Sequence, residues 1–285
     1  MSEQSVFDRI TQEYYQLTAS EKKLASFLMA NGKQAQNMSI SEMADACSVA
    51  KATISRFCRR MGYEGYSAFR LAIASANAAR PVYGMPLSGE ISEEDTVKTL
   101  SDKLAAAEIS AINETKALIR PADIMAAADI LQASDKVLCM GQGASMLMAQ
   151  EMAHLFMTAF SGYFAVTDSH MQIMSISNLG PRDTIFYFSY SGSTKDLKDV
   201  LSLAKKRGVK TLMVTRYPHS PGAEQADMVL QCGFTESPLQ LGSVPARISQ
   251  LYLVDVLFSE MCRRDLTTCK NNRKRVADAL ADKHL

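Results

Sequence analysis

The hexapeptide Ser189-Tyr190-Ser191-Gly192-Ser193-Thr194 lies between an apolar segment, 184–188, and a segment with apolar residues at helical spacing, 195–204. The apolar segment is typical of a buried parallel strand. The first backbone N–H groups of a helix have no partner within it, and the helix dipole favours an anion there. The hydroxyl groups of the hexapeptide add neutral donors. We therefore expect a phosphate-binding turn, while a serine that only caps the helix is the alternative.

Short apolar segments alternate with helical periodicity from residue 135 onward. The expected strands are 136–140, 162–166, 184–188, 210–214 and 228–232. The expected helices are 144–160, 169–178, 194–207, 219–226 and 245–262. This alternation predicts an α/β domain with a doubly wound, five-stranded parallel sheet. Ligands of such sheets bind beyond the carboxyl ends of the strands, where a second glycine-rich turn, Gly141-Gln142-Gly143-Ala144-Ser145, is also expected.

The N-terminal part of the chain has a different pattern. Residues 1–78 show helical periodicity and no strand-like segment, which predicts an all-α domain. The stretch 79–91 that follows contains two prolines and two glycines and is expected to be a linker. The C-terminal domain, 92–285, then begins with two expected helices, 92–118 and 121–133.

Two short helices are expected within the N-terminal domain, at 39–47 and 50–61. Ser39 and Glu42 have the spacing of a capping box at the start of the first. One face of the second helix is apolar and should be buried: Ile54, Phe57, Cys58 and Met61. The opposite face is polar and basic: Lys51, Thr53, Ser55, Arg56, Arg59 and Arg60. This arrangement fits a helix-turn-helix whose second helix enters the major groove of DNA, and a solvated basic face on an ordinary helical bundle is the alternative.

The residues of the basic face are expected to divide their roles by chemistry. Lys51, Arg59 and Arg60 are placed to contact phosphates, which supply affinity without sequence information. The other three residues of that face are candidates to reach base edges, which carry the sequence.

Both halves resemble the RpiR family of bacterial transcription regulators, in which a helix-turn-helix domain precedes a sugar isomerase (SIS) domain that binds phosphosugars. The resemblance rests on 39–44, 51–57 and 61–63 in the first half, and on 141–145 and 189–194 in the second. Ala50 is a departure, because the family often has serine there. The resemblance implies a homodimer or tetramer that binds operator DNA, responds to a phosphorylated sugar and controls genes of carbohydrate metabolism.

The resemblance also implies a phosphate cradle made by Ser145 from the first turn with Ser189, Ser191 and Thr194 from the second. The sugar end is expected to involve residues after the second strand and before the last helix. The whole expected phosphosugar site is Gly143, Ser145, His170, Ser189, Ser191, Gly192, Ser193, Thr194, Glu236 and Arg247. For Arg247, a helix cap or a salt bridge is an equally good interpretation.

Several classes of function are disfavoured by the composition and motifs. No cofactor is expected, because Met146 stands where a dinucleotide-binding fingerprint needs its third glycine. The six cysteines have no metal-ligand spacing and are expected to be buried reduced thiols in a cytoplasmic protein. No segment is long and apolar enough to cross a membrane.

Two other functions fit the pattern less well. An aldose–ketose phosphate isomerase would need a general base and an acid. His170 and Glu236 could be assigned these roles, but no tight His/Glu constellation is visible in the sequence, and such an enzyme has no need of a basic helix-turn-helix. The other possibility is a SIS protein whose N-terminal helices bind a second protein.

Overall fold

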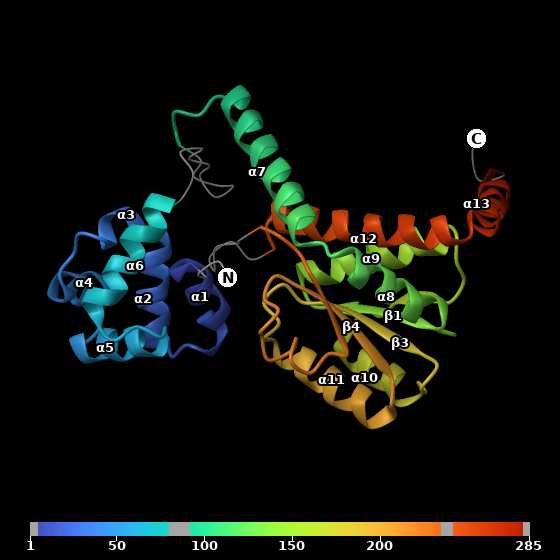
Figure 1. Cartoon of the computed structure of the whole chain (residues 1–285), viewed down its shortest axis with the longest axis horizontal. Helices are drawn as coiled ribbons and strands as arrows, with labels where there is room; N and C mark the ends of the chain where they lie inside the picture. Colours follow the sequence, from blue (N-terminus) through green and yellow to red (C-terminus); the bar gives the residue numbers. More distant parts are fainter. Residues whose placement is uncertain (1–4, 80–91, 235–241, 282–285) are drawn as a thin grey trace. The chain divides into compact units, whose positions relative to one another are not determined.

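The computed structural model describes residues 5–79, 92–234 and 242–281, and contacts divide the chain into two compact units (Figure 1). One unit ends at Lys103, and the other begins at Leu104. Each unit has its own buried apolar core.

The N-terminal unit is built from helices. In chain order these are α1 (Val6–Glu13), the short 3-10 helix η1 (Tyr14–Gln16), α2 (Ala19–Ala30), α3 (Gly32–Ala35), α4 (Ile40–Cys47), α5 (Lys51–Arg60) and α6 (Tyr66–Ala79). The predicted apolar face of α5 is confirmed, since Ile54 and Phe57 are fully buried in the core. Phe69 of α6 packs edge-on against Phe57, with ring centroids 5.8 Å apart, and so fixes α6 against α5.

The α4–α5 connection has the geometry of a helix-turn-helix. The predicted capping box is confirmed: the Ser39 N–H donates to Glu42 Oε2 (2.7 Å), and the Glu42 N–H donates to Ser39 Oγ (3.2 Å). Ser48 ends α4 in the left-handed conformation with φ of 52°, and the Val49 N–H returns to the Ala44 carbonyl (3.0 Å). The chain therefore reverses within three residues and starts α5.

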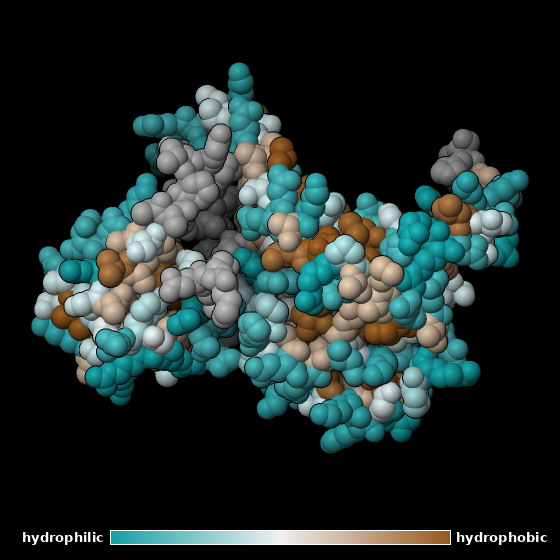
Figure 2. Space-filling view, in the orientation of Figure 1, coloured by the Kyte–Doolittle hydropathy of each residue, from teal (hydrophilic) through white to brown (hydrophobic). Residues whose placement is uncertain are grey.

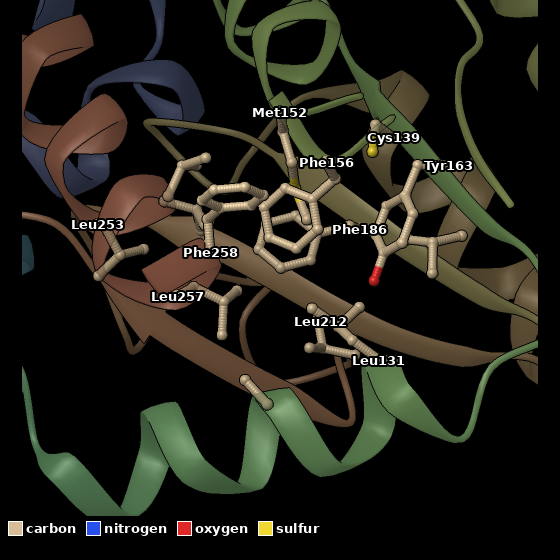
Figure 3. Packing of buried hydrophobic residues seen from close by; sticks show 14 of the residues in the cluster. Leu131, Cys139, Met152, Phe156, Tyr163, Phe186, Leu212, Leu253, Leu257 and Phe258 are labelled. Atoms are coloured by element: carbon tan, nitrogen blue, oxygen red, sulfur yellow. The ribbon is translucent and has the colours of Figure 1, made fainter. Parts of the chain in front are cut away.

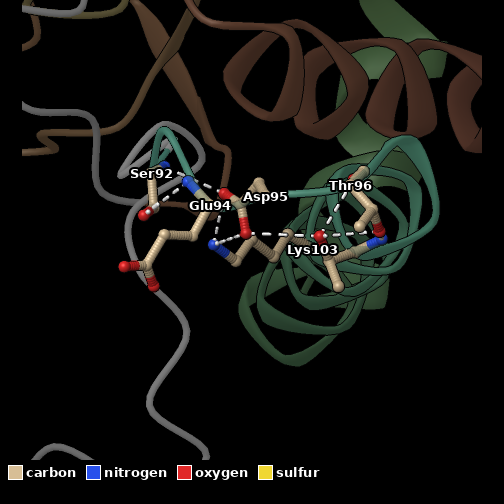
Figure 4. A network of polar contacts seen from close by, with 6 residues as sticks. Ser92, Glu94, Asp95, Thr96 and Lys103 are labelled. Carbon is tan, nitrogen blue, oxygen red and sulfur yellow. Dashed lines mark hydrogen bonds and ion pairs between the residues drawn. The ribbon is translucent and has the colours of Figure 1, made fainter.

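The long helix α7 (Val97–Leu118) begins five residues later than expected from the Ser92 pattern. The residues before it fold back onto its first turns instead (Figure 4). Lys103 Nζ lies 2.6 Å from Asp95 Oδ2, and the Ser92 N–H donates to the same carboxylate (2.9 Å). These hydrogen bonds, first of all the one from Lys103, hold the pKa of Asp95 below its usual value. The entry to α7 is therefore held by charge as well as by backbone bonds.

The second unit contains the predicted five-stranded parallel sheet, and its strand order is β2-β1-β3-β4-β5. Its strands are β1 (Val137–Gly141), β2 (Tyr163–Ala165), β3 (Thr184–Phe188), β4 (Lys210–Thr215) and β5 (Met228–Gln231). Its remaining helices are α8 (Pro121–Gln132), α9 (Ala144–Met157), α10 (Ser169–Ser177), α11 (Lys195–Arg207), α12 (Val244–Arg264) and α13 (Leu266–Ala281).

Helices cover both faces of this sheet (Figure 1). One face packs against α8, α9 and α12, and the other packs against α10 and α11. Successive residues of β3 alternate between the two cores, so that Phe186 and Phe188 enter the first and Ile185 and Tyr187 enter the second. Figure 3 shows the first core, where the ring of Phe156 lies among other aromatic side chains. Strands buried on both faces explain the uninterrupted apolar segments of the sequence.

Two local expectations are wrong. The helix expected at 219–226 is a series of turns, because Pro221-Gly222 breaks the periodicity and the Gly222 N–H bonds to the Gly192 carbonyl (2.9 Å) instead. The cysteines are not all reduced either. Cys262 and Cys269 form a disulfide, because the chain turns between α12 and α13 and brings their Cα atoms to 5.5 Å.

The surface of the face shown in Figure 2 is mostly hydrophilic, with scattered apolar side chains. Within the described residues, none of the helices combines the length and the apolar character that a membrane span requires.

Replacement of Phe156 tests the importance of the aromatic cluster. Phe156→Ala removes a fully buried ring that contacts Tyr163 and Phe258, and we expect the free energy of unfolding to fall by about 3–5 kcal/mol. Met157→Ala, at the next position and half exposed, should change it by less than about 0.5 kcal/mol. Urea denaturation followed by circular dichroism measures both. Equal losses in the two variants would contradict the packing described here.

Candidate functional site

The two glycine-rich turns follow neighbouring strands. β1 and β3 pair in parallel, and their last residues, Gly141 and Phe188, are partners in the register. Each strand leads directly into its turn and then into a helix, α9 or α11. The two turns therefore lie side by side at the carboxyl edge of the sheet, with two helix N-termini next to each other.

The first turn depends on two glycines. A Cβ on Gly141 would lie 2.8 Å from the backbone carbonyl of Ser145, so only glycine lets α9 start so close to β1. Gly143 has φ of 56° and ψ of −128°, a conformation restricted to glycine, and the position of its missing Cβ is open. Open space over Gly143 leaves room for a ligand at the N-terminus of α9. Ser145 is the hydroxyl residue of this first helical turn and is half-buried.

The second turn holds its hydroxyl groups in a fixed arrangement. Ser189 and Ser191 are buried, with 4% and 7% of their surface exposed. The Gly192 N–H donates to Ser189 Oγ (3.2 Å), and the Ser193 N–H lies 3.4 Å from Ser191 Oγ. Gly192 itself has φ of 63° and lies against Ser220, which leaves no room for a Cβ. The turn is therefore preorganised by its own backbone and by the 217–226 segment.

A buried polar atom at the start of α12 lacks a partner. Arg247 Nε, in the first turns of α12, makes no hydrogen bond to any residue that the structure describes, whereas Thr194, at the N-cap of α11, lies close to the Tyr187 hydroxyl. The residues just before α12 lie against the first glycine-rich turn. A Cβ on Gly242 would overlap the Cβ of Ala144, the first residue of α9. Buried polar atoms without partners are rare in folded proteins, and a bound anion would supply the missing acceptor.

The other predicted members of the site are placed less closely. His170 is exposed in the first turn of α10, which follows β2 at the same edge of the sheet. Glu236 lies outside the described residues.

Sequence reasoning missed one side chain at this edge. Gln172 is fully buried and its Nε2 donates to the carbonyls of Gly141 (3.2 Å) and Val166 (2.9 Å), which fixes the end of β1. The sequence did contain a signal for this residue, because Gln172 is an amide at an otherwise apolar position of the expected helix 169–178.

The side chains on the polar face of α5 are exposed or half-buried, as the sequence predicts. Lys51, Arg56 and Arg59 are exposed, and Thr53 and Ser55 are half-buried. Arg60 is also exposed, and it makes ion pairs within the domain. Its guanidinium lies 3.3 Å from Glu13 Oε2 and 3.4 Å from Glu21 Oε2, and it also donates to the carbonyl of Gln16. Its charge is balanced within the domain, and it ties α5 to the preceding helices.

Comparison with known proteins agrees with this architecture. Residues 4–80 match the helix-turn-helix domain of the rpiR family, and residues 130–260 match the SIS domain. An uncharacterised HTH-type transcriptional regulator of Caldanaerobacter subterraneus subsp. tengcongensis is 33% identical over 241 residues, which are 85% of this chain and 84% of that protein. The chain belongs to the RpiR family.

Other proteins match over most of the chain or over its second unit. The HTH-type transcriptional regulator HexR of Escherichia coli is 25% identical over 278 residues, 98% of this chain and 95% of HexR. The structure of Vibrio vulnificus NanR complexed with ManNAc-6P aligns with a TM-score of 0.64 at 24% identity and covers 98% of this chain and 99% of NanR. The sugar isomerase domain of an RpiR transcription factor from Sphaerobacter thermophilus aligns with a TM-score of 0.58 at 23% identity, over 63% of this chain and 98% of that one. The SIS-like fold predicted for the second unit is thereby confirmed.

Gly192 offers a test of the second turn. Gly192→Ala places a Cβ against Ser220 at a positive φ, and we expect it to destabilise the SIS domain by about 1–3 kcal/mol. Gly180→Ala is the matched control, because its Cβ would meet no atom within 4 Å. Thermal and urea denaturation compare the two variants with the unmodified chain. A Gly192→Ala variant as stable as Gly180→Ala would show that the turn is not constrained as described.

Proposed function

We propose that this RpiR-family chain is a transcriptional regulator whose SIS domain binds a phosphorylated sugar and thereby changes the affinity of its helix-turn-helix for operator DNA. The observation that carries the proposal is the register of β1 and β3, which brings two hydroxyl-lined turns and two helix N-termini together. Phosphate oxygens need several donors converging on one point, and this edge of the sheet offers them.

The proposed phosphate cradle consists of Ser145, Ser189, Ser191, Ser193 and Thr194, with the backbone amides of the two turns. Arg247 Nε would gain the partner that it lacks in the described residues. His170 and Glu236 are proposed to contact the sugar. Phosphosugar binding by this chain is supported by its SIS domain and by the NanR structure, which contains ManNAc-6P.

The proposed DNA surface is the exposed face of α5. Lys51 and Arg59 would contact phosphates, and Thr53, Ser55 and Arg56 would contact base edges. Arg60 is left out, because the carboxylates of the same domain already neutralise it. We propose a DNA-binding domain of residues 1–78, a linker of 79–91 and a SIS domain of 92–285.

The remaining assignments follow from the family. The named relatives are transcriptional regulators, which supports a regulator rather than an isomerase. Helix-turn-helix regulators bind two half-sites as dimers, so we propose a homodimer or a tetramer. We also propose that the protein is cytoplasmic and that the genes it regulates belong to carbohydrate metabolism.

Substitution of Ser191 tests the cradle. The probes are inorganic phosphate, glucose 6-phosphate and N-acetylmannosamine 6-phosphate, each added to the full chain in a thermal-shift titration. A ligand at 100 times its Kd stabilises the folded state by about 2.7 kcal/mol, so binding of any probe raises Tm measurably. We expect Ser191→Ala to lose more than half of the largest shift, because a buried hydroxyl of the cradle is removed.

Ser202→Ala is the matched control for this substitution, since Ser202 is exposed on α11 and away from its N-terminus. Its Tm shifts should equal those of the unmodified chain. If no probe raises Tm in the unmodified chain, or if Ser191→Ala responds like Ser202→Ala, the cradle is misassigned.

The double substitution Arg56→Ala with Arg59→Ala tests the DNA surface. DNA fragments selected from a genomic library by the unmodified chain serve as targets in gel-shift titrations. Loss of two cationic contacts should weaken binding at least about 100-fold at 0.15 M salt, while the Tm shifts with the phosphate probes remain.

Lys205→Ala with Lys206→Ala removes the same charge from the exposed end of α11 and is the control. DNA affinity should change little in this variant. Equal weakening in both double variants would point to a general charge effect, and no weakening in the first would exclude α5 as the DNA surface.

A further inference from the structure

The turn that follows β3 is connected to α7 through one residue, Phe234. The Tyr190 hydroxyl donates to the Phe234 carbonyl (2.9 Å), and the Phe234 N–H donates to Glu114 Oε2 on α7 (2.8 Å). Tyr190 stands between Ser189 and Ser191 of the proposed cradle. Two consecutive hydrogen bonds therefore join the cradle turn to the helix that leads toward the DNA-binding domain in the chain.

The backbone of Phe234 is held in an unfavourable conformation. Its φ is 64°, in the left-handed region that a bulky residue rarely adopts, while its ring is 6% exposed. The preceding residue, Gly233, lies flat on α7: its N–H donates to Thr115 Oγ1 (3.0 Å), and a Cβ there would meet the Thr115 N at 2.5 Å. Such a conformation persists only where the surrounding contacts enforce it.

The contacts around Phe234 come from separate elements. Its ring packs with Ala111 of α7 and Ala246 of α12, and the ring of Tyr190 completes this small cluster. The main chain of Tyr190 is itself fixed, because its carbonyl accepts from Thr215 Oγ1 (3.0 Å) and from the Arg216 N–H (3.2 Å). A change in the cradle turn thus reaches Phe234 directly rather than being absorbed by a loose loop.

We propose that Phe234 is a positioning residue that couples occupancy of the cradle to α7, with Tyr190 on the cradle side and Glu114 on the helix side. A phosphate group bound at Ser189 and Ser191 further restrains Tyr190, which holds Phe234 in the left-handed conformation through its hydroxyl group, while Glu114 binds the Phe234 N–H. With the cradle empty, the strained backbone relaxes more often and α7 is less firmly held. This inference rests on the proposed function, since it assumes phosphate binding in the cradle.

Hydrogen–deuterium exchange of the full chain measures this coupling at the amides of α7 from Ala107 to Leu118. The probes are again inorganic phosphate, glucose 6-phosphate and N-acetylmannosamine 6-phosphate, and the one with the largest Tm shift is used. We expect it to slow α7 exchange about fivefold or more, the lower end of common coupling between sites. Glu114→Ala should reduce this protection to less than about twofold, while its Kd for the probe stays within about threefold of the unmodified chain.

Two matched variants separate coupling from simple loss of structure. Glu114→Gln keeps a carbonyl oxygen that accepts the Phe234 N–H, so it should retain most of the protection. Glu108→Ala removes the same group from the same helix without a hydrogen bond to Phe234, and its protection should equal that of the unmodified chain. Equal loss of protection in Glu108→Ala and Glu114→Ala would overturn the assignment, as would full protection in Glu114→Ala.

Tyr190→Phe provides a second test, because it removes one hydroxyl and keeps the ring in its cluster. Tyr190→Phe should lose the ligand-induced protection of α7 as Glu114→Ala does. The double variant Tyr190→Phe with Glu114→Ala should lose no more of this protection than either single variant. Independent, additive losses would show that the two residues do not act through Phe234. A probe that raises Tm without protecting α7 would overturn this coupling and leave the proposed function standing, whereas no Tm shift with any probe would remove both.

Discussion

The pairing of β1 with β3 is the constraint on which the site depends. Because Gly141 and Phe188 are register partners, the turns that follow them must emerge next to each other. A slip of one residue would turn alternate side chains of β3 from one core to the other, burying Phe186 and Phe188 on the wrong face. The packing of the two cores thus fixes the relative position of the hydroxyl groups, although none of these groups belongs to a core.

Much of this arrangement could be predicted from the sequence, because it depends on local patterns. Apolar segments, glycines and the Ser39 capping box each have short-range meanings, and they gave the sheet, the turns and the helix-turn-helix. What local patterns could not show depends on contacts between distant residues. Arg60 has the chemistry of a phosphate contact, and it also pairs with Glu21 and Glu13, which lie 39 and 47 residues away in the chain. The turns at 219–226 form because that segment packs under Gly192.

The conformation of Phe234 shows the same limit more clearly. No local pattern predicts a left-handed phenylalanine. Glycine adopts this conformation most readily, and the glycine of this segment stands one position earlier, at 233. The conformation exists because Glu114, 120 residues away in the chain, captures the Phe234 N–H. Residues held in this way are candidates for function, because strained backbone conformations cluster at functional sites.

A ligand can change DNA affinity only if it favours one state of the protein over another. α7 has the properties of a lever for such a change. Its 22 residues correspond to a rod about 33 Å long, and no proline interrupts it. The Lys103–Asp95 pair holds its first turns (Figure 4), and Glu114 and Thr115 hold its last turns to the segment after β5. The boundary between the two units falls within this helix, after Lys103, so α7 is one continuous element shared by both units.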